Sequence, residues 1–88
     1  MSNHKITLKE EDLRAAPLFL SIVVPVFNEA TGIDAFHSRL QQTLSQMNGI
    51  VSEILYIDDG STDTTPRKLE EIHDQDANVS IARLSRNF

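Results

Sequence analysis

The sequence predicts an α/β fold in which strands and helices alternate and the strands form a parallel sheet. Three runs of mostly apolar, β-favouring residues, at 19–24, 53–57 and 79–84, have the composition of strands. Between them lie two segments whose apolar residues recur at three- and four-residue steps, the spacing of one face of a helix. Strands joined by helical crossovers pair in parallel. The expected order is therefore strand, helix, strand, helix, strand.

The first strand is expected to be covered on both faces, because residues 19–24 are nearly all apolar. Proline cannot donate a hydrogen bond within a sheet, so Pro25 is expected to end this strand. In the helix that follows, Asn28 or Thr31 is the expected cap, and Asn48 with Gly49 marks the expected end. One stripe of that helix carries its apolar residues, which are Ile33, Phe36, Leu40, Leu44 and Met47.

The second helix is expected to begin near Asp63 or Thr65, with Pro66 in its first turn, where a missing N–H has no helical partner to lose. Leu69 and Ile72 should face the core. We expect the first strand to lie in the middle of the sheet. Residues 1–18 are interpreted as a polar N-terminal arm that precedes the folded part, residues 19–88.

The composition of the chain excludes several classes of function. The chain has 88 residues, 40% of them hydrophobic, so it is at most one small domain. It has no cysteine, which excludes disulfides, thiolate metal sites and a thiol nucleophile. A net charge of −5 argues against nucleic-acid binding. The longest apolar stretch, residues 18–27, is shorter than the roughly 20 residues of a spanning helix, and no secretory signal is present, so a cytoplasmic location is expected.

Polar residues follow the predicted end of each strand, at 25–29, 58–61 and 85–88. The carboxyl ends of parallel strands lie on one edge of a sheet, where α/β proteins bind their ligands. The three segments are therefore expected to meet at one edge. This edge is the predicted ligand site.

Asp58 and Asp59 form a carboxylate pair before Gly60. One interpretation is a turn in which one acid caps the next helix. The other is a ligand site, because a carboxylate at this point of an α/β unit commonly accepts from ribose hydroxyls or from the ring N–H of a base. If the backbone is extended, only one of the two can face the crevice, and Asp59 is preferred because it adjoins Gly60.

The residues after the first strand also have two interpretations. Asn28 and Glu29 suit either a helix start or a ligand contact. Phe27 is either a core residue or one wall of a slot for a flat base, beside Pro25. The three histidines, at positions 4, 37 and 73, are expected to be packed or solvated, because no carboxylate or cysteine is spaced to complete a metal site.

Three segments, "SIVVPVFNE", "EILYIDDGSTD" and "ARLSRNF", occur in an order and spacing that closely resemble the amino-terminal part of family 2 glycosyltransferases. The resemblance covers about residues 20–88. It is nearest to the subgroup that includes dolichol-phosphate mannose synthases and bactoprenol glucosyltransferases. It implies a Rossmann-like half-domain of the GT-A type. It also implies transfer of a hexose from a UDP- or GDP-sugar to a polyprenyl phosphate at the cytoplasmic face of a membrane, in cell-wall or glycan biosynthesis.

Carried over position by position, the resemblance implies nucleotide-binding roles for six residues: Pro25, Phe27, Asn28, Glu29, Asp58 and Asp59. Many relatives have tyrosine where Phe27 stands, so a hydroxyl contact is expected to be missing while stacking survives. Three residues of the last motif, Ser85, Arg86 and Asn87, are implied as a substrate loop of the polyprenyl-phosphate subgroup.

Other parts of the family pattern are not found in these 88 residues. They are the Asp-x-Asp motif that holds Mg²⁺ or Mn²⁺, the acid that deprotonates the acceptor, and the helices that dock on the membrane. The chain is therefore expected to be the nucleotide-recognition part of such an enzyme, without catalytic residues and inactive alone. A non-catalytic remnant or nucleotide-binding module is the alternative.

Two further classes fit the sequence less well. A nicotinamide-dependent dehydrogenase needs glycines after its first strand, and "PVFNEATG" lacks them there. A phosphorylation receiver domain needs a phosphoacceptor aspartate at the end of a later strand, and "IARLSRNF" contains none.

Overall fold

The computed structural model describes residues 17–85. Along the chain the elements are β1 (Leu18–Val26), α2 (Ile33–Ser45), β2 (Ile50–Asp58), α3 (Thr65–Gln75) and β3 (Val79–Arg83). The three strands form one parallel sheet in the order β1-β2-β3. The predicted α/β class, element order and parallel pairing are confirmed.

The expectation that the first strand lies in the middle is wrong, because β2 is central. That expectation rested on the need for three polar segments to meet at one edge. Any order of parallel strands satisfies this need, so the argument could not determine the order. In the structure the two helical crossovers connect β1 to β2 and β2 to β3, so both move in the same direction across the sheet.

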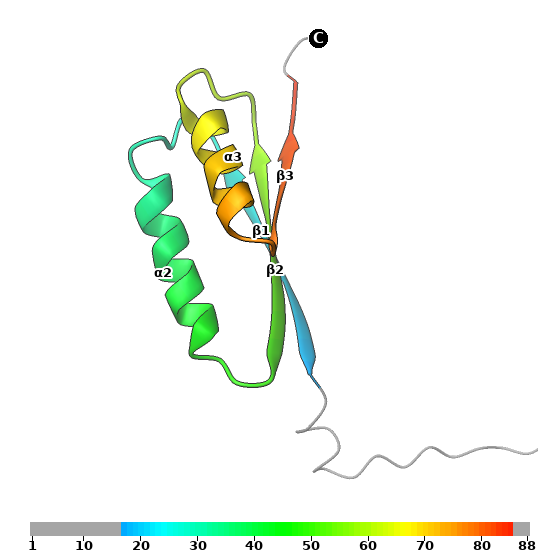
Figure 1. Cartoon of the computed structure of the whole chain (residues 1–88). Coiled ribbons are helices and arrows are strands. Elements are labelled where there is room, and N and C mark those ends of the chain that lie inside the picture. The colour runs from blue at the N-terminus through cyan, green and yellow to red at the C-terminus, as the bar shows by residue number, and fades with distance from the viewer. Residues whose placement is uncertain (1–16, 86–88) are drawn as a thin grey trace, which may run out of the picture.

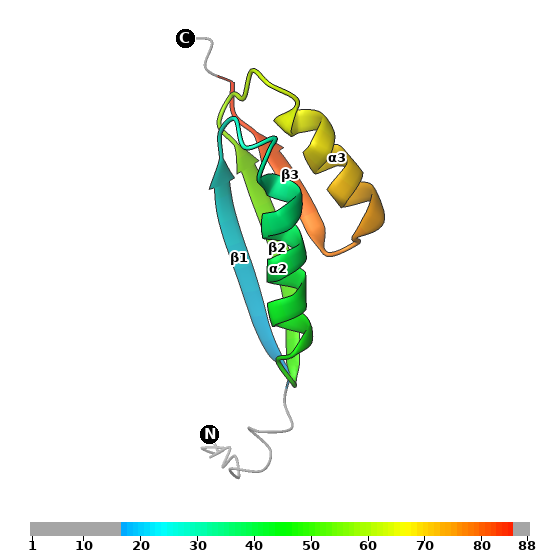
Figure 2. The same ribbon diagram turned by 90° about the vertical axis from the view of Figure 1, so that its left-hand side faces the viewer.

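Both helices pack on the same face of the sheet (Figures 1 and 2). Crossovers of one hand that step in one direction place their helices on one side. Side chains of alternate strand residues meet the helices there. The buried core consists of Val26, Ile33, Ile54, Tyr56, Leu69, Ile72 and Val79.

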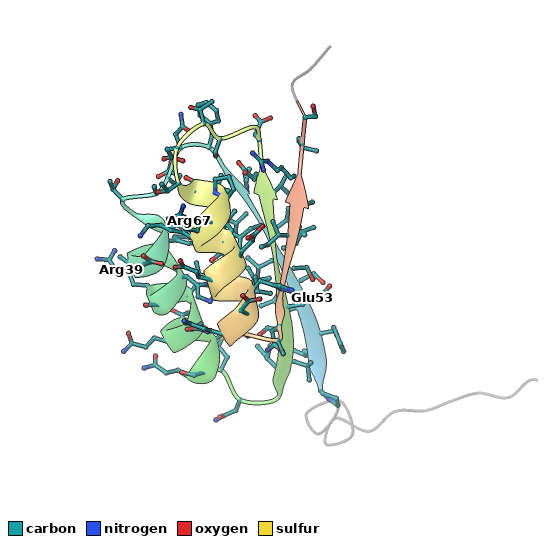
Figure 3. The ribbon with its side chains drawn as sticks, turned by 45° about the horizontal axis from the view of Figure 1, so that its top comes forward. Arg39, Glu53 and Arg67 are labelled. Carbon is teal, nitrogen blue, oxygen red and sulfur yellow. The ribbon has the colours of Figure 1, made fainter. Side chains whose placement is uncertain are left out.

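The other face of the sheet carries apolar side chains that no described element covers. Phe19 is 75% exposed and Val23 is 56% exposed. Between Phe19 and Val23 on β1, the Ser21 hydroxyl donates a hydrogen bond to the Glu53 carboxylate on β2. Figure 3 shows Glu53 on β2, and Arg39 on the outer side of α2. The expectation that β1 is covered on both faces is therefore wrong for the described part of the chain.

Pro25 lies inside β1, opposite Ile57, and the strand continues to Val26. The Val26 carbonyl accepts a hydrogen bond from the backbone N–H of Asp59 at 2.9 Å. Successive strand residues direct their backbone groups to opposite sides, so Pro25 faces the outer edge, where a missing N–H breaks no sheet hydrogen bond. The predicted strand end was therefore one residue too early.

The start of α2 also differs from the prediction. Its N-cap is Gly32 and no side chain caps it, so neither Asn28 nor Thr31 has that role. The helix ends at Ser45, and Met47 lies beyond it, half-exposed. Phe36 is also half-exposed, although its ring packs edge-on against the Tyr56 ring, with 6.5 Å between the ring centroids.

The second predicted helix is confirmed as α3. Pro66 lies in its first turn, after Thr64 as N-cap. Leu69 and Ile72 are both buried, as the sequence predicted. Neither helix in the described part of the chain is long and apolar enough to cross a membrane.

Candidate functional site

The segments that follow the three strands meet at the carboxyl edge of the sheet (Figure 1). They are the loop after β1, residues 27–32, the loop after β2, residues 59–64, and the two described residues after β3, Leu84 and Ser85. We call the first two the β1 loop and the β2 loop. The structure thus brings the β1 and β2 loops together as predicted, with Asn28 and Asp59 at the same end of the sheet.

Asn28 joins the two loops. Its backbone N–H donates to the Ser61 hydroxyl at 2.9 Å. Its side-chain oxygen accepts from the backbone N–H groups of Thr62 at 2.8 Å and Asp63 at 3.3 Å. Asn28 has a φ of +48°, a conformation that asparagine adopts more readily than most residues. The carbonyl oxygen of its amide is therefore used to hold the β2 loop.

Asp63 and Thr65 make a second set of links. The Glu29 N–H donates to the Thr65 hydroxyl at 2.9 Å, and the Ala30 N–H donates to Asp63 Oδ2 at 3.3 Å. Asp63 Oδ1 accepts from the Thr65 backbone N–H at 2.9 Å. Hydrogen bonds donated by the Thr65 hydroxyl and by the backbone N–H groups of Thr65 and Ala30 hold the pKa of the Asp63 carboxyl below its usual value. The two loops therefore form one hydrogen-bonded unit.

The sequence analysis did not predict this unit. The signal in the sequence was an asparagine shortly after the first apolar strand and a Ser/Thr/Asp-rich segment after the second, because these residue types hydrogen-bond backbone groups in turns.

Asp58 is buried, with 1% of its surface exposed. Its Oδ1 accepts from the Ser61 N–H at 3.0 Å, across a turn in which Gly60 has a φ of +73°. Its Oδ2 has no hydrogen bond within the described structure and lies 3.8 Å from the Arg83 Nε. Asp58 is therefore placed to shape the turn, with its charge partly offset by Arg83.

Asp59 is only partly buried. Its backbone N–H is bound to the Val26 carbonyl, which ties the start of the β2 loop to the end of β1. Asp58 is thus buried and Asp59 is more exposed, the alternation that an extended backbone produces. The choice of Asp59 as the ligand contact stays a prediction.

A hollow of about 260 Å³ lies beside the end of β1. Glu29 contributes its polar lining, and the rest comes from Val24, Pro25, Val26, Gly32, Ile33 and Phe36. Phe27 is 43% exposed and does not line this hollow. Pro25 and Phe27 therefore do not share this cavity.

The remaining predicted site residues lie near or beyond β3. Ser85 is exposed after β3, while Arg86, Asn87 and Phe88 lie outside the described residues, as does His4. His37 is buried beside Tyr56, whereas His73 is exposed and its Nδ1 lies 2.6 Å from the Val79 carbonyl, so the expectation of packed or solvated histidines is confirmed for both. Residues 17–85 contain no group of three or more His, Cys, Asp or Glu residues that could hold a metal ion.

Comparison with known proteins identifies the family. Residues 21–88 match the sequence model of Glycosyl transferase family 2. The chain belongs to glycosyl transferase family 2. The predicted family and the Rossmann-like, GT-A type of half-domain are confirmed.

Several family 2 relatives are similar over most of this chain. An uncharacterized glycosyltransferase of Synechocystis is 36% identical over 69 residues, which are 78% of this chain and 21% of the relative. One from Bacillus subtilis is 40% identical over 68 residues, 77% of this chain and 21% of the relative. A prophage bactoprenol glucosyl transferase homolog of Escherichia coli is 33% identical over 69 residues, which are 78% of this chain and 22% of the relative. The chain thus spans about a fifth of these family 2 proteins.

Proposed function

We propose that this chain provides the nucleoside-recognition loops of a glycosyltransferase that uses a nucleotide diphosphate sugar. The observation that carries the proposal is the joined pair of loops at the carboxyl edge. At this edge Asp58 is buried, whereas Asp59, whose backbone N–H binds the Val26 carbonyl, is only partly buried. Carboxylate acceptors on hydrogen-bonded loops at the edge of a sheet suit a ligand that presents N–H or O–H donors.

In this proposal Asp59 accepts a hydrogen bond from the base or the ribose of the donor. Phe27, which is half-exposed, offers a flat apolar surface for stacking, and the exposed Glu29 carboxylate reaches ribose hydroxyls. Pro25 contributes to the apolar side of the site. Asn28 and Asp58 act through the loops, because their side chains bind the backbone of the β2 loop.

The diphosphate part of the donor requires a different environment. Four carboxylates, those of Glu29, Asp58, Asp59 and Asp63, lie on or beside the two loops, and they repel an anion. A divalent ion, Mg²⁺ or Mn²⁺, would offset the charge of the departing nucleotide diphosphate, as members of this family generally require. We therefore expect these loops to recognise the nucleoside rather than the diphosphate.

The acceptor is proposed to be a polyprenyl phosphate. Several relatives similar to this chain are named bactoprenol glucosyl transferases, and this resemblance supports the proposal. Ser85, Arg86 and Asn87 are the residues proposed to face the acceptor or the sugar. The reaction would then take place at the cytoplasmic face of a membrane.

Calorimetric titration tests the nucleoside site. Uridine, guanosine and their diphosphates are titrated, with and without magnesium, into the wild-type chain and Asp59→Asn. Loss of a charge-assisted hydrogen bond is expected to weaken nucleoside binding about ten- to a hundredfold. The matched control is Asp74→Asn, which removes the same charge from an exposed position near the end of α3.

The control is expected to bind like the wild type. Equal binding by wild type and Asp59→Asn would overturn the assignment of Asp59. Binding that depends steeply on magnesium would show that the diphosphate, rather than the nucleoside, dominates recognition.

A further inference from the structure

One buried histidine behind the candidate site lies between two other polar side chains. His37 comes from α2, Tyr56 from β2, and Asp76 from the turn between α3 and β3. The His37 Nδ1 lies 2.6 Å from the Tyr56 hydroxyl oxygen, and the His37 Nε2 lies 3.4 Å from Asp76 Oδ2. His37 and Tyr56 are both buried, at 6% and 0% exposure. The contacts connect three elements of the fold.

The direction of the hydrogen bond follows from the chemistry of the phenol. Burial, with a further contribution from the charge of Asp76, raises the pKa of Tyr56 to about 12. The hydroxyl therefore keeps its proton, and among the described residues its only hydrogen-bond partner is His37 Nδ1. A ring nitrogen that accepts this proton carries no hydrogen itself. The ring hydrogen of neutral His37 must then be on Nε2, which faces Asp76.

Other hydrogen bonds hold Asp76 beside His37. Its Oδ1 accepts from the Asn78 backbone N–H at 3.0 Å, and its Oδ2 accepts from the Gln41 side chain at 2.6 Å. Burial alone would raise the pKa of Asp76, but these hydrogen bonds and the proximity of His37 hold it below its usual value. The carboxylate is therefore ionised at neutral pH. Its contact with Nε2 lacks hydrogen-bond geometry and is an electrostatic attraction.

The contacts lie close to the two loops in sequence and in space. Tyr56 is two residues before Asp58 on the same face of β2, and both are buried. His37 is in the second turn of α2, which follows directly on the β1 loop. The His37–Tyr56 bond thus fixes the start of α2 against the end of β2. Any shift between these two elements displaces one loop relative to the other.

We propose that His37 is a positioning residue which, as the Nε2–H tautomer, holds the β1 loop in register with the Asp58–Asp59 end of β2. It acts through Tyr56 and does not touch the ligand. The inference deepens the proposed function and, for its effect on affinity, rests on it. Its tautomer and its effect on the loops can be measured without any nucleotide.

The tautomer is tested by long-range proton–nitrogen NMR on the ¹⁵N-labelled 88-residue chain at neutral pH. The expected spectrum of His37 has a protonated Nε2 and an unprotonated Nδ1. Tyr56→Phe removes only the hydroxyl and should abolish this preference. A protonated Nδ1 in the wild type, alone or together with Nε2, would overturn the inference.

Positioning is tested with a matched pair of His37 variants. His37→Asn keeps a hydrogen-bond acceptor near the position of Nδ1, whereas His37→Leu keeps side-chain volume but has no acceptor. Amide resonances of residues 28–32 and 58–60 are expected to shift in His37→Leu and Tyr56→Phe and to return towards wild type in His37→Asn. Nucleoside affinity should fall about two- to tenfold in the first two variants, the value of one net hydrogen bond.

His73→Asn is the control, because this histidine on α3 also uses Nδ1 for a hydrogen bond but binds the backbone at the start of β3. It should leave the loop resonances unchanged. Loop resonances that are unaffected in both His37→Leu and Tyr56→Phe would refute positioning. If the wild type fails to bind nucleosides while the loop shifts occur as expected, the proposed function fails and the positioning role stands.

Discussion

At the scale of single residues, Asn28 contributes to the geometry of the two loops through both its backbone and its side chain. Its φ of +48° lies in the left-handed region, which costs most residues about 1 to 2 kcal/mol. Its side-chain oxygen receives two backbone N–H groups of the β2 loop. Asparagine therefore suits this position twice, because it tolerates the left-handed backbone conformation and its side-chain oxygen accepts the two hydrogen bonds.

Two substitutions separate these contributions. Asn28→Gly keeps the backbone conformation and loses the side-chain hydrogen bonds, whereas Asn28→Ala loses the bonds and adds backbone strain. We expect Asn28→Gly to reduce the free energy of unfolding by about 1 to 2 kcal/mol, and Asn28→Ala by about 1 kcal/mol more. Urea unfolding measures both values. Equal stability of the alanine and glycine variants would contradict the strain argument.

Tyr56 offers a direct optical test of its burial, because it is the only tyrosine and the chain has no tryptophan. Its pKa is raised from 10.0 to about 12. An acid whose folded pKa is raised contributes stability that is fully present below pH 10 and is lost as pH rises through the folded pKa. Alkaline titration of the tyrosinate absorbance should have its midpoint near pH 12 or coincide with unfolding. A midpoint near pH 10 in the folded chain would show that the hydroxyl is accessible.

At the scale of elements, the α3–β3 turn is connected to α2 by Asp76, which binds Gln41 at 2.6 Å and faces His37. These contacts need the ionised carboxylate. Since the pKa of Asp76 is below its usual value of 3.8, its contribution is present above that value and is lost as pH falls through the folded pKa. The connection between α2 and α3 should therefore weaken in acid.

The substitution Asp76→Asn tests this dependence. At neutral pH we expect the free energy of unfolding to fall by about 1 kcal/mol, the net value of a hydrogen bond. The difference from wild type should shrink only as the pH falls through the folded pKa of Asp76, which lies below 3.8, because the wild-type carboxyl is then protonated as well. Thermal unfolding at a series of pH values gives the curve. A difference that stays constant down to the acid limit would mean that the ionised form is not what stabilises the turn.

Elements could be predicted from sequence where composition alone determines them, and less well where tertiary contacts decide. Pro66 and the apolar spacing of Leu69 and Ile72 correctly placed α3. The cap of α2 was predicted wrongly, because the side chain of Asn28 binds the neighbouring loop instead of its own helix. Strand order was also predicted wrongly, since no local pattern distinguishes a central strand from an edge strand in a short parallel sheet.

At the scale of the whole molecule, the described residues form a sheet with helices on one face only (Figure 2). The meeting of the β1 loop and the β2 loop at one edge of the sheet could be predicted, because parallel strands place their carboxyl ends together. The different burial of Asp58 and Asp59 could also be predicted, because adjacent residues of an extended backbone point in opposite directions, whereas the role of Asp59 as the ligand contact stays a prediction. The links between the loops could not be predicted, since they join residues more than thirty positions apart.

The face of the sheet opposite the helices leads to a prediction about association. Phe19 and Val23 expose apolar surface there, and burying such a side chain stabilises a contact by about 1.5 to 3 kcal/mol. We expect the 88-residue chain to self-associate with rising concentration, and Val23→Lys to weaken this association at least about tenfold. Gln42→Lys, which adds the same charge at an exposed position of α2, should associate like the wild type. Sedimentation equilibrium measures all three, and a wild type that stays monomeric with a cooperative thermal transition would show that this face needs no cover.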